Sequence, residues 1–183
     1  MFAIWAALKK HAIHYSSVTK TPGGSRLVNS QFVRFLDQSI ANTQANCVDG
    51  SVLFASLLRK IGINPFLVAL PGHMYLGFYL NSSENEDELE YVGLETTLIG
   101  ASEVEESDSV WPDALAELSE QLNDKTLNGK AWKSFVAAVL TGTDDLDKNE
   151  EKFDVGDPEY QMIDIAEARD KGIMPISFEA KSR

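Results

Sequence analysis

Residues 46–65 read NCVDGSVLFASLLRKIGINP and carry the clearest structural signal in the sequence. A helix from Cys47 to Ile61 has apolar side chains around most of its circumference. This is typical of a helix that is buried on nearly all sides. Gly62, followed by Pro65, predicts where the helix ends. We therefore expect a central buried helix that other elements cover.

After Pro65 the apolar residues follow the two-residue period of β-strands. Strands are predicted over residues 66–70, 73–80 and 90–95. In the middle strand the aliphatic face is formed by Met74, Leu76, Phe78 and Leu80. The opposite face carries His73, Tyr75, Gly77 and Tyr79. This pattern predicts an α+β fold in which the central buried helix packs on an antiparallel β-sheet.

Further helices are predicted to flank this core. They cover residues 2–13, a stretch from Asn29 or Ser30 to Ala41, about 112–123, and 130–141. In the second helix, the side chains predicted to face the core are Phe32, Phe35, Leu36 and Ile40. Residues 142–159 are acidic and are predicted to be turn-rich and mobile. An apolar segment at 162–165 and a short helix to Lys171 follow.

The length of 183 residues fits a single domain. We expect its core at about 27–100 and a C-terminal helical part at about 110–175. The sequence has no secretory signal and no run of about 18–20 apolar residues that could cross a membrane. This predicts a cytoplasmic protein, or a domain of a longer protein, that does not bind a membrane.

The chain contains 16 Lys and Arg, 28 Asp and Glu, and one Cys, for a net charge of −12. The acidic balance argues against binding to nucleic acid. One cysteine excludes an internal disulfide and a thiolate zinc cluster. Residues 61–124 hold 14 acidic residues and no Lys or Arg. We interpret them either as a solvated surface or as an acidic rim that attracts cationic substrates.

Three residues have the chemistry of a nucleophilic site. Cys47 begins the buried helix, where free N–H groups and the helix dipole lower the pKa of a thiol. His73 opens the strand that follows the Pro71-Gly72 turn, and Glu95 ends the next strand on the same face. They are candidates for a nucleophile, a base and an orienting acid. The alternatives are an inert core cysteine, a structural histidine and a solvated strand-end acid.

Side-chain sizes suggest how the two strands pair. If His73 lies opposite Glu95 in an antiparallel hairpin, two aromatic–glycine pairs result on the same face: Tyr75 with Gly93, and Gly77 with Tyr91. This register predicts a carboxylate beside the imidazole ring.

Residues 46–65, with HMYLGFYL at 73–80 and YVGLETT at 91–97, resemble the bacterial transglutaminase-like superfamily. The resemblance covers about residues 46–97 and implies a papain-like core. It implies that Cys47 is the nucleophile, His73 the general base and then acid, and Glu95 the orienting acid. The chain departs from the family pattern at two positions. The usual acid is Asp, and Met74 stands where an aromatic residue commonly follows the His.

The resemblance also implies a reaction, which is acyl transfer through a thioester. We expect hydrolysis of a peptide or side-chain amide, with a peptide or protein as substrate. An amine acyltransferase and a catalytically inactive binding or regulatory module are the alternatives. The Cys47 N–H would hold the oxyanion, with a second donor among Gln44, Gln31 and Tyr15.

No cofactor or metal is implied. His11 and His14 lie three residues apart on the predicted first helix, but no third ligand accompanies them. The oligomeric state is left open.

Overall fold

The structure is a computed structural model that describes residues 1–16, 33–83, 85, 88–101 and 129–175. The helix predicted over about 112–123 and the candidate oxyanion donor Gln31 lie outside these residues. Among the helices that are described, none is long and apolar enough to cross a membrane.

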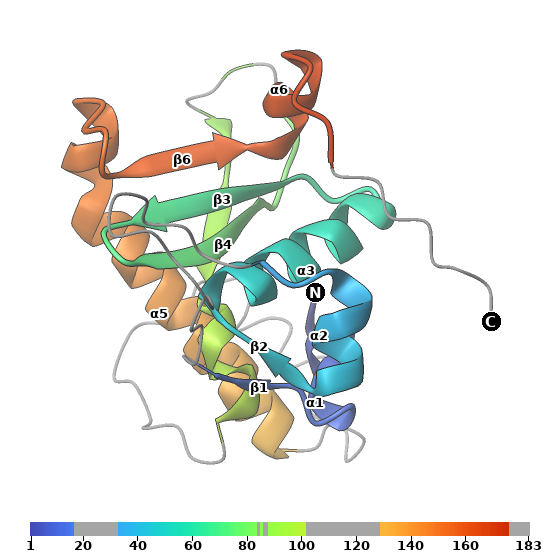
Figure 1. Cartoon of the computed structure of the whole chain (residues 1–183). Helices are drawn as coiled ribbons and strands as arrows, with labels where there is room; N and C mark the ends of the chain where they lie inside the picture. The colour runs from blue at the N-terminus through green and yellow to red at the C-terminus, as the bar shows by residue number, and fades with distance from the viewer. Residues whose placement is uncertain (17–32, 84, 86–87, 102–128, 176–183) are drawn as a thin grey trace, which may run out of the picture.

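A four-stranded sheet forms the centre of the fold (Figure 1). Its strands are β3 (Pro65–Leu70), β4 (His73–Tyr79), β5 (Tyr91–Leu94) and β6 (Gln161–Asp164). Their spatial order is β5-β4-β3-β6, and all neighbours are antiparallel. The predicted α+β class with an antiparallel sheet is therefore confirmed. The sequence pattern identified β6 only as an apolar segment.

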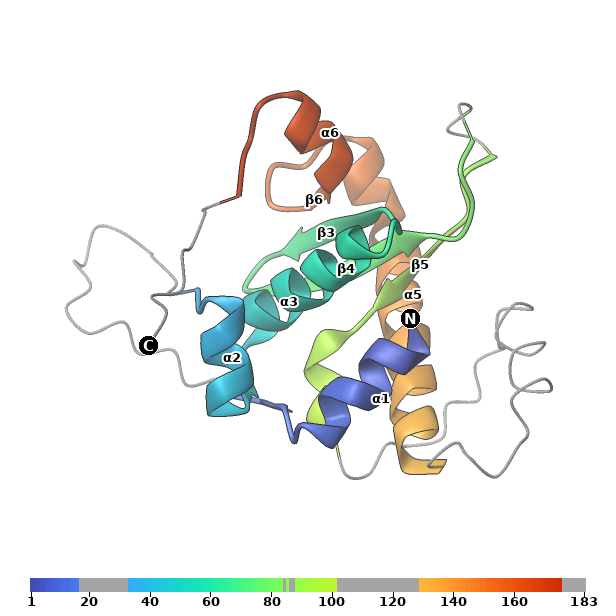
Figure 2. The ribbon, with the colours of Figure 1, turned by 90° about the vertical axis from the view of Figure 1, so that its right-hand side faces the viewer.

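Helices cover both faces of this sheet (Figure 2). Helix α3 (Cys47–Lys60) lies on one face, where its Leu53 and Leu58 share a buried cluster with Leu76 of β4. Helix α5 (Gly129–Asp154) crosses the other face, where its Leu146 shares a second cluster with Tyr75 of β4. Neighbouring residues of β4 thus face opposite helices, as the predicted alternation requires.

The remaining elements surround the α3 side of the sheet and its edges. They are α1 (Phe2–Lys10), β1 (His14–Tyr15), α2 (Leu36–Asn42), β2 (Gln44–Ala45), the 3-10 helix η2 (Thr96–Gly100) and α6 (Ile165–Asp170). Strands β1 and β2 form a separate parallel pair. The fully buried Trp5 of α1 donates from its Nε1 to Ser134 Oγ of α5 at 3.0 Å. This bond joins the N-terminal helix to the C-terminal half of the chain.

The start of α3 is fixed by a reciprocal cap. The side chain of Asn46 accepts a hydrogen bond from the Asp49 backbone N–H at 2.8 Å, and the Asp49 carboxylate accepts one from the Asn46 N–H at 3.1 Å. Arg34 binds the buried Asp49 carboxylate through its backbone N–H at 2.8 Å and through Nη1 at 2.6 Å. These bonds set the first turn of α3 and attach the preceding segment to it.

Helix α5 is much longer than predicted. The prediction ended a helix at 141 and placed a turn-rich segment over 142–159, but α5 continues to Asp154. Gly142 is in the helix because α5 crosses β5 closely there. A Cβ on Gly142 would stand 2.5 Å from the Leu94 N and 2.9 Å from the Glu95 N. This glycine therefore marks a close approach of two backbones rather than a helix end.

Two other helix predictions need correction. Helix α1 ends at Lys10, and Ala12 takes a left-handed conformation with φ 56°, so His11 and His14 do not share a helix face. Helix α2 begins only at Leu36. Phe35 and Ile40, which were predicted to be buried, are exposed, while Ser39 is buried in their place.

Candidate functional site

Cys47 is the first residue of α3 and is almost completely buried. Its place directly after the Asn46 cap confirms the predicted helix start. Residues at this position lie beside backbone N–H groups that have no partner within the helix. A thiolate is therefore favoured here over the same group in mid-helix.

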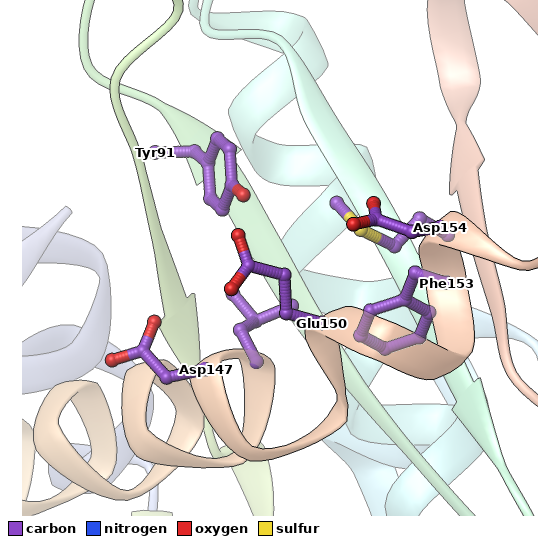
Figure 3. Close-up of a pocket in the computed structure, with 7 residues that line it drawn as sticks. Tyr91, Asp147, Glu150, Phe153 and Asp154 are labelled. Atoms are coloured by element: carbon purple, nitrogen blue, oxygen red, sulfur yellow. The ribbon is translucent and has the colours of Figure 1, made fainter.

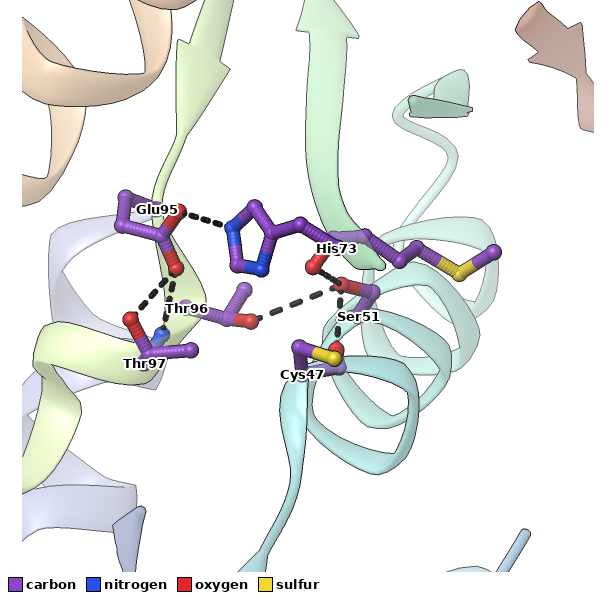
Figure 4. Close-up of polar contacts among 7 residues, drawn as sticks. Cys47, Ser51, His73, Glu95, Thr96 and Thr97 are labelled. Carbon is purple, nitrogen blue, oxygen red and sulfur yellow. Dashed lines mark hydrogen bonds and ion pairs between the residues drawn. The ribbon is translucent and has the colours of Figure 1, made fainter. Parts of the chain in front are cut away.

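His73 and Glu95 form a short hydrogen bond (Figure 4). The His73 Nε2 lies 2.6 Å from the Glu95 Oε2. The other carboxylate oxygen, Oε1, accepts from the Thr97 N–H at 2.9 Å and from the Thr97 hydroxyl at 2.6 Å. Glu95 is buried, and its backbone N–H donates to the Ala138 carbonyl of α5 at 2.8 Å. Both carboxylate oxygens therefore hold fixed partners.

The strand register that brings these groups together differs from the predicted one by two residues. Gly77 faces Gly93, and Tyr79 faces Tyr91, so neither predicted aromatic–glycine pair forms. Continued beyond Leu94, this register places Glu95 diagonally from His73 rather than opposite it. A shift of two residues keeps every side chain on its predicted face. Long side chains can span a diagonal pair of about 7–8 Å, and Glu is longer than Asp by one methylene.

The bond to Glu95 determines the protonation of the imidazole. An ionised carboxylate only accepts hydrogen bonds, so His73 Nε2 must carry a proton. Nδ1 is then the ring nitrogen that can exchange a proton with Cys47. The pKa of His73 is raised to about 10, first by hydrogen bonding to Cys47 and then by hydrogen bonding to Glu95.

The pKa values of Cys47 and Glu95 are both lowered, opposite to that of His73. Hydrogen bonding to His73 lowers the pKa of the Cys47 thiol and outweighs burial, with further lowering from hydrogen bonds to the Met74 and Val48 backbone. Burial opposes ionisation of Glu95, but hydrogen bonds from His73 and Thr97 outweigh it and lower the pKa of Glu95. These shifts describe a thiolate beside an imidazolium that a carboxylate orients.

Three residues that hold the site together were not predicted from the sequence pattern. Ser51 Oγ donates to the Cys47 carbonyl at 2.7 Å and lies 3.4 Å from Thr96 Oγ1 (Figure 4). A Cβ on Gly50 would stand 2.9 Å from the same Thr96 oxygen. These contacts link α3 to the residue directly after Glu95. A glycine in the first turn of the predicted helix was the signal that could have revealed this close approach.

The structure places two of the three candidate oxyanion donors near Cys47. Strands β1 and β2 pair in parallel, with Tyr15 opposite Ala45 and His14 opposite Gln44. Gln44 precedes Cys47 by three residues in the chain. Tyr15 lies on the strand that pairs with the Gln44 segment. Charges on Cys47 and Glu95 contribute, after burial, to raising the pKa of the Tyr15 phenol.

Part of the predicted acidic rim lies away from this site. Glu88 and Glu90 precede β5, whereas His73 is at the opposite end of the neighbouring strand β4. The seven residues of β4 span roughly 20 Å at about 3.3 Å per residue. These two carboxylates therefore do not border the Cys47 thiol.

The described residues contain no group of three or more His, Cys, Asp or Glu side chains that could hold a metal ion. His14 Nδ1 instead lies 3.2 Å from the Ala12 carbonyl. No protein-family model matches the sequence, and neither a curated protein nor a solved structure matches it.

Proposed function

We propose that this chain is a cysteine-dependent acyl-transfer enzyme that hydrolyses peptide or side-chain amides. The observation that carries the proposal is the arrangement of Cys47, His73 and Glu95. A thiol at a helix N-terminus hydrogen-bonds to an imidazole whose other nitrogen lies 2.6 Å from a buried carboxylate. This is the arrangement of nucleophile, base and orienting acid that nucleophilic catalysis requires.

The proposed reaction begins with attack of the Cys47 thiolate on the carbonyl carbon of an amide. The C–S bond forms as the carbonyl π electrons move to oxygen, which becomes an oxyanion. The imidazolium of His73 then gives its Nδ1 proton to the amide nitrogen, the oxyanion electrons re-form the C=O bond, and the C–N bond breaks. This step releases an amine and leaves a thioester on Cys47.

Water completes the proposed cycle. Neutral His73 removes a proton from a water molecule, and the resulting hydroxide oxygen attacks the thioester carbon. The C–S bond breaks, the carboxylic acid leaves, and the thiolate–imidazolium pair is restored. Glu95 accepts the same hydrogen bonds throughout and stabilises the imidazolium each time it forms.

The proposal includes a papain-like, transglutaminase-like core as the finer description of the fold. Two features support it. The nucleophile begins a central helix that packs on an antiparallel sheet, and the base and the acid follow on neighbouring strands in the chain order Cys47, His73, Glu95.

A covalent adduct tests the function directly. The purified chain is incubated with p-nitrophenyl acetate, and intact-mass and peptide mass spectrometry then locate any acetyl group. We expect an acetyl thioester on Cys47 that disappears with time, together with steady release of p-nitrophenol. Cys47→Ser is the matched control, because it keeps the size of the side chain and removes the thiolate.

Absence of both an adduct on Cys47 and Cys47-dependent release of p-nitrophenol, in a folded protein, would contradict the proposal. An adduct that is stable in water and is removed only by an added amine would indicate that the enzyme transfers the acyl group to an amine and does not hydrolyse it.

A further inference from the structure

Strand β1 lies between the two segments that carry the proposed catalytic groups. On one side it pairs with β2, which leads directly into Cys47, through hydrogen bonds from His14 N to the Thr43 carbonyl and from Ser16 N to the Ala45 carbonyl. On the other side it packs against the end of η2, the 3-10 helix that follows Glu95. A Cβ on Gly100 would stand 2.6 Å from the His14 Cα and 3.3 Å from the Tyr15 N. Tyr15 is therefore fixed between the nucleophile segment and the acid segment.

The Tyr15 ring is accessible to a substrate. Its exposed fraction is 41%, whereas Cys47 and Glu95 are buried. The phenol also responds to the charges of both residues, because burial first and then the negative charges on Cys47 and Glu95 raise its pKa. The hydroxyl therefore keeps its proton at neutral pH and remains a hydrogen-bond donor.

Two other polar side chains near Cys47, both among the described residues, are less suited to this role. The Nδ2 of Asn46 is fully buried and cannot reach a substrate oxygen. Gln44 is partly buried, whereas Tyr15 is exposed. Tyr15 combines an exposed donor with a fixed place beside the nucleophile.

We propose that the Tyr15 hydroxyl is the second oxyanion donor of the site, acting with the backbone N–H of Cys47. The inference rests on the proposed function, since an oxyanion forms only if Cys47 attacks a carbonyl group. As the thiolate adds to the carbonyl carbon, the oxygen gains a full negative charge. The Tyr15 O–H then donates a hydrogen bond to that oxygen without losing its proton.

Two reagents separate this role from a role in activating the thiol. Iodoacetamide alkylates a thiolate by displacing iodide from a saturated carbon, so no oxyanion develops. p-Nitrophenyl acetate acylates the same thiolate through an oxyanion. Tyr15→Phe should therefore lower the rate of acylation by about 100-fold, the scale expected for one lost donor, and leave the rate of alkylation unchanged. Unchanged alkylation also reports that the variant has folded.

Tyr91→Phe is the matched control, because Tyr91 has the same exposed fraction of 41% and lies at the far end of β5 beside the carboxylates of α5 (Figure 3). This variant should acylate and alkylate at wild-type rates. The proposal is overturned if Tyr15→Phe acylates normally, if it slows both reactions equally, or if Gln44→Ala alone shows the selective loss. If the wild-type chain is neither alkylated rapidly nor acylated, the proposed function itself fails.

Discussion

The Glu95 carboxylate fixes the chemistry of the neighbouring His73 imidazole. Its Oε1 is held by two bonds from Thr97, so only Oε2 faces His73 Nε2. An acceptor at this position selects the imidazole tautomer that leaves Nδ1 free for the thiol. The carboxylate therefore determines which nitrogen works as the base.

Glu95→Gln tests this selection of tautomer. Thr97 can still donate to the amide oxygen, but the amide NH₂ group then faces His73 and donates to Nε2. The ring proton moves to Nδ1, which can no longer accept a proton from Cys47. We expect iodoacetamide to react at least about 10-fold more slowly with Cys47 at pH 6, because the thiolate loses its stabilised partner. A rate equal to that of the wild type would show that Glu95 does not orient His73.

Close contacts between elements position these residues. Helix α3 approaches Thr96 at Gly50, and α5 approaches the end of β5 at Gly142. Glu95 stands between the two contacts, and its backbone is bonded to Ala138 of α5. The geometry of the site therefore depends on two helices that lie on opposite faces of the sheet.

Gly142→Ala should be destabilising, although Gly→Ala inside a helix normally stabilises it by about 0.5–1 kcal/mol. The added Cβ would stand 2.5 Å from the Leu94 backbone N, so α5 and β5 must separate. We expect a loss of roughly 1–3 kcal/mol in chemical denaturation. Gly129→Ala, where no described residue beyond the chain neighbours and the helix's own backbone has a heavy atom within 4 Å of the added Cβ, is the control and should lose nothing. Equal effects of the two substitutions would contradict the close crossing.

The buried ion pair between Arg34 and Asp49 at the start of α3 gives a second test of how the elements are held together. The Asp49 carboxylate is fully buried, and the side chain of Arg34 is 16% exposed. Removal of the guanidinium leaves an uncompensated buried charge, so Arg34→Ala should cost about 3–5 kcal/mol in the free energy of unfolding. Lys148→Ala, which breaks an exposed pair with Asp144, should leave the free energy of unfolding almost unchanged. An Arg34 effect as small as that of Lys148 would contradict this account.

The sequence was most informative about individual elements. The span of α3 from Cys47 and the faces of β4 were predicted, because they depend on local periodicity, whereas the Asn46 cap was not. The strand register was not predicted, since a shift of two residues leaves the alternation of faces unchanged. The length of α5 was missed because Gly142 looks like a helix end unless its neighbour in space is known.

Across the whole molecule, the acidic residues lie in different places relative to the proposed site. The acidic block over 61–124 includes Glu95, which is buried at the site, and Glu90, which is exposed at the far end of β5. Exposed charges are screened over about 8–10 Å at physiological ionic strength. Glu90, roughly 20 Å from His73 along the strands, is therefore too distant to steer a substrate toward Cys47.

Glu90→Gln should leave the rate of Cys47 acylation unchanged with both a neutral and a cationic ester. The same rates at low salt and at 0.15 M NaCl would agree with this expectation. A selective loss of rate with the cationic ester that disappears at 0.15 M NaCl would indicate that Glu90 does belong to the predicted acidic rim.

The proposed mechanism requires His73 to hold Cys47 as a thiolate. The pH dependence of Cys47 alkylation by iodoacetamide tests it most directly, with His73→Ala measured beside the wild type. In the wild type we expect the rate to rise with a midpoint below about 8.5, the usual pKa of a free thiol, because the pKa of Cys47 is lowered while that of His73 is raised to about 10. In His73→Ala the midpoint should move to about 8.5 or higher. A wild-type midpoint at or above that of a free thiol, or one that His73→Ala leaves unchanged, would contradict the account.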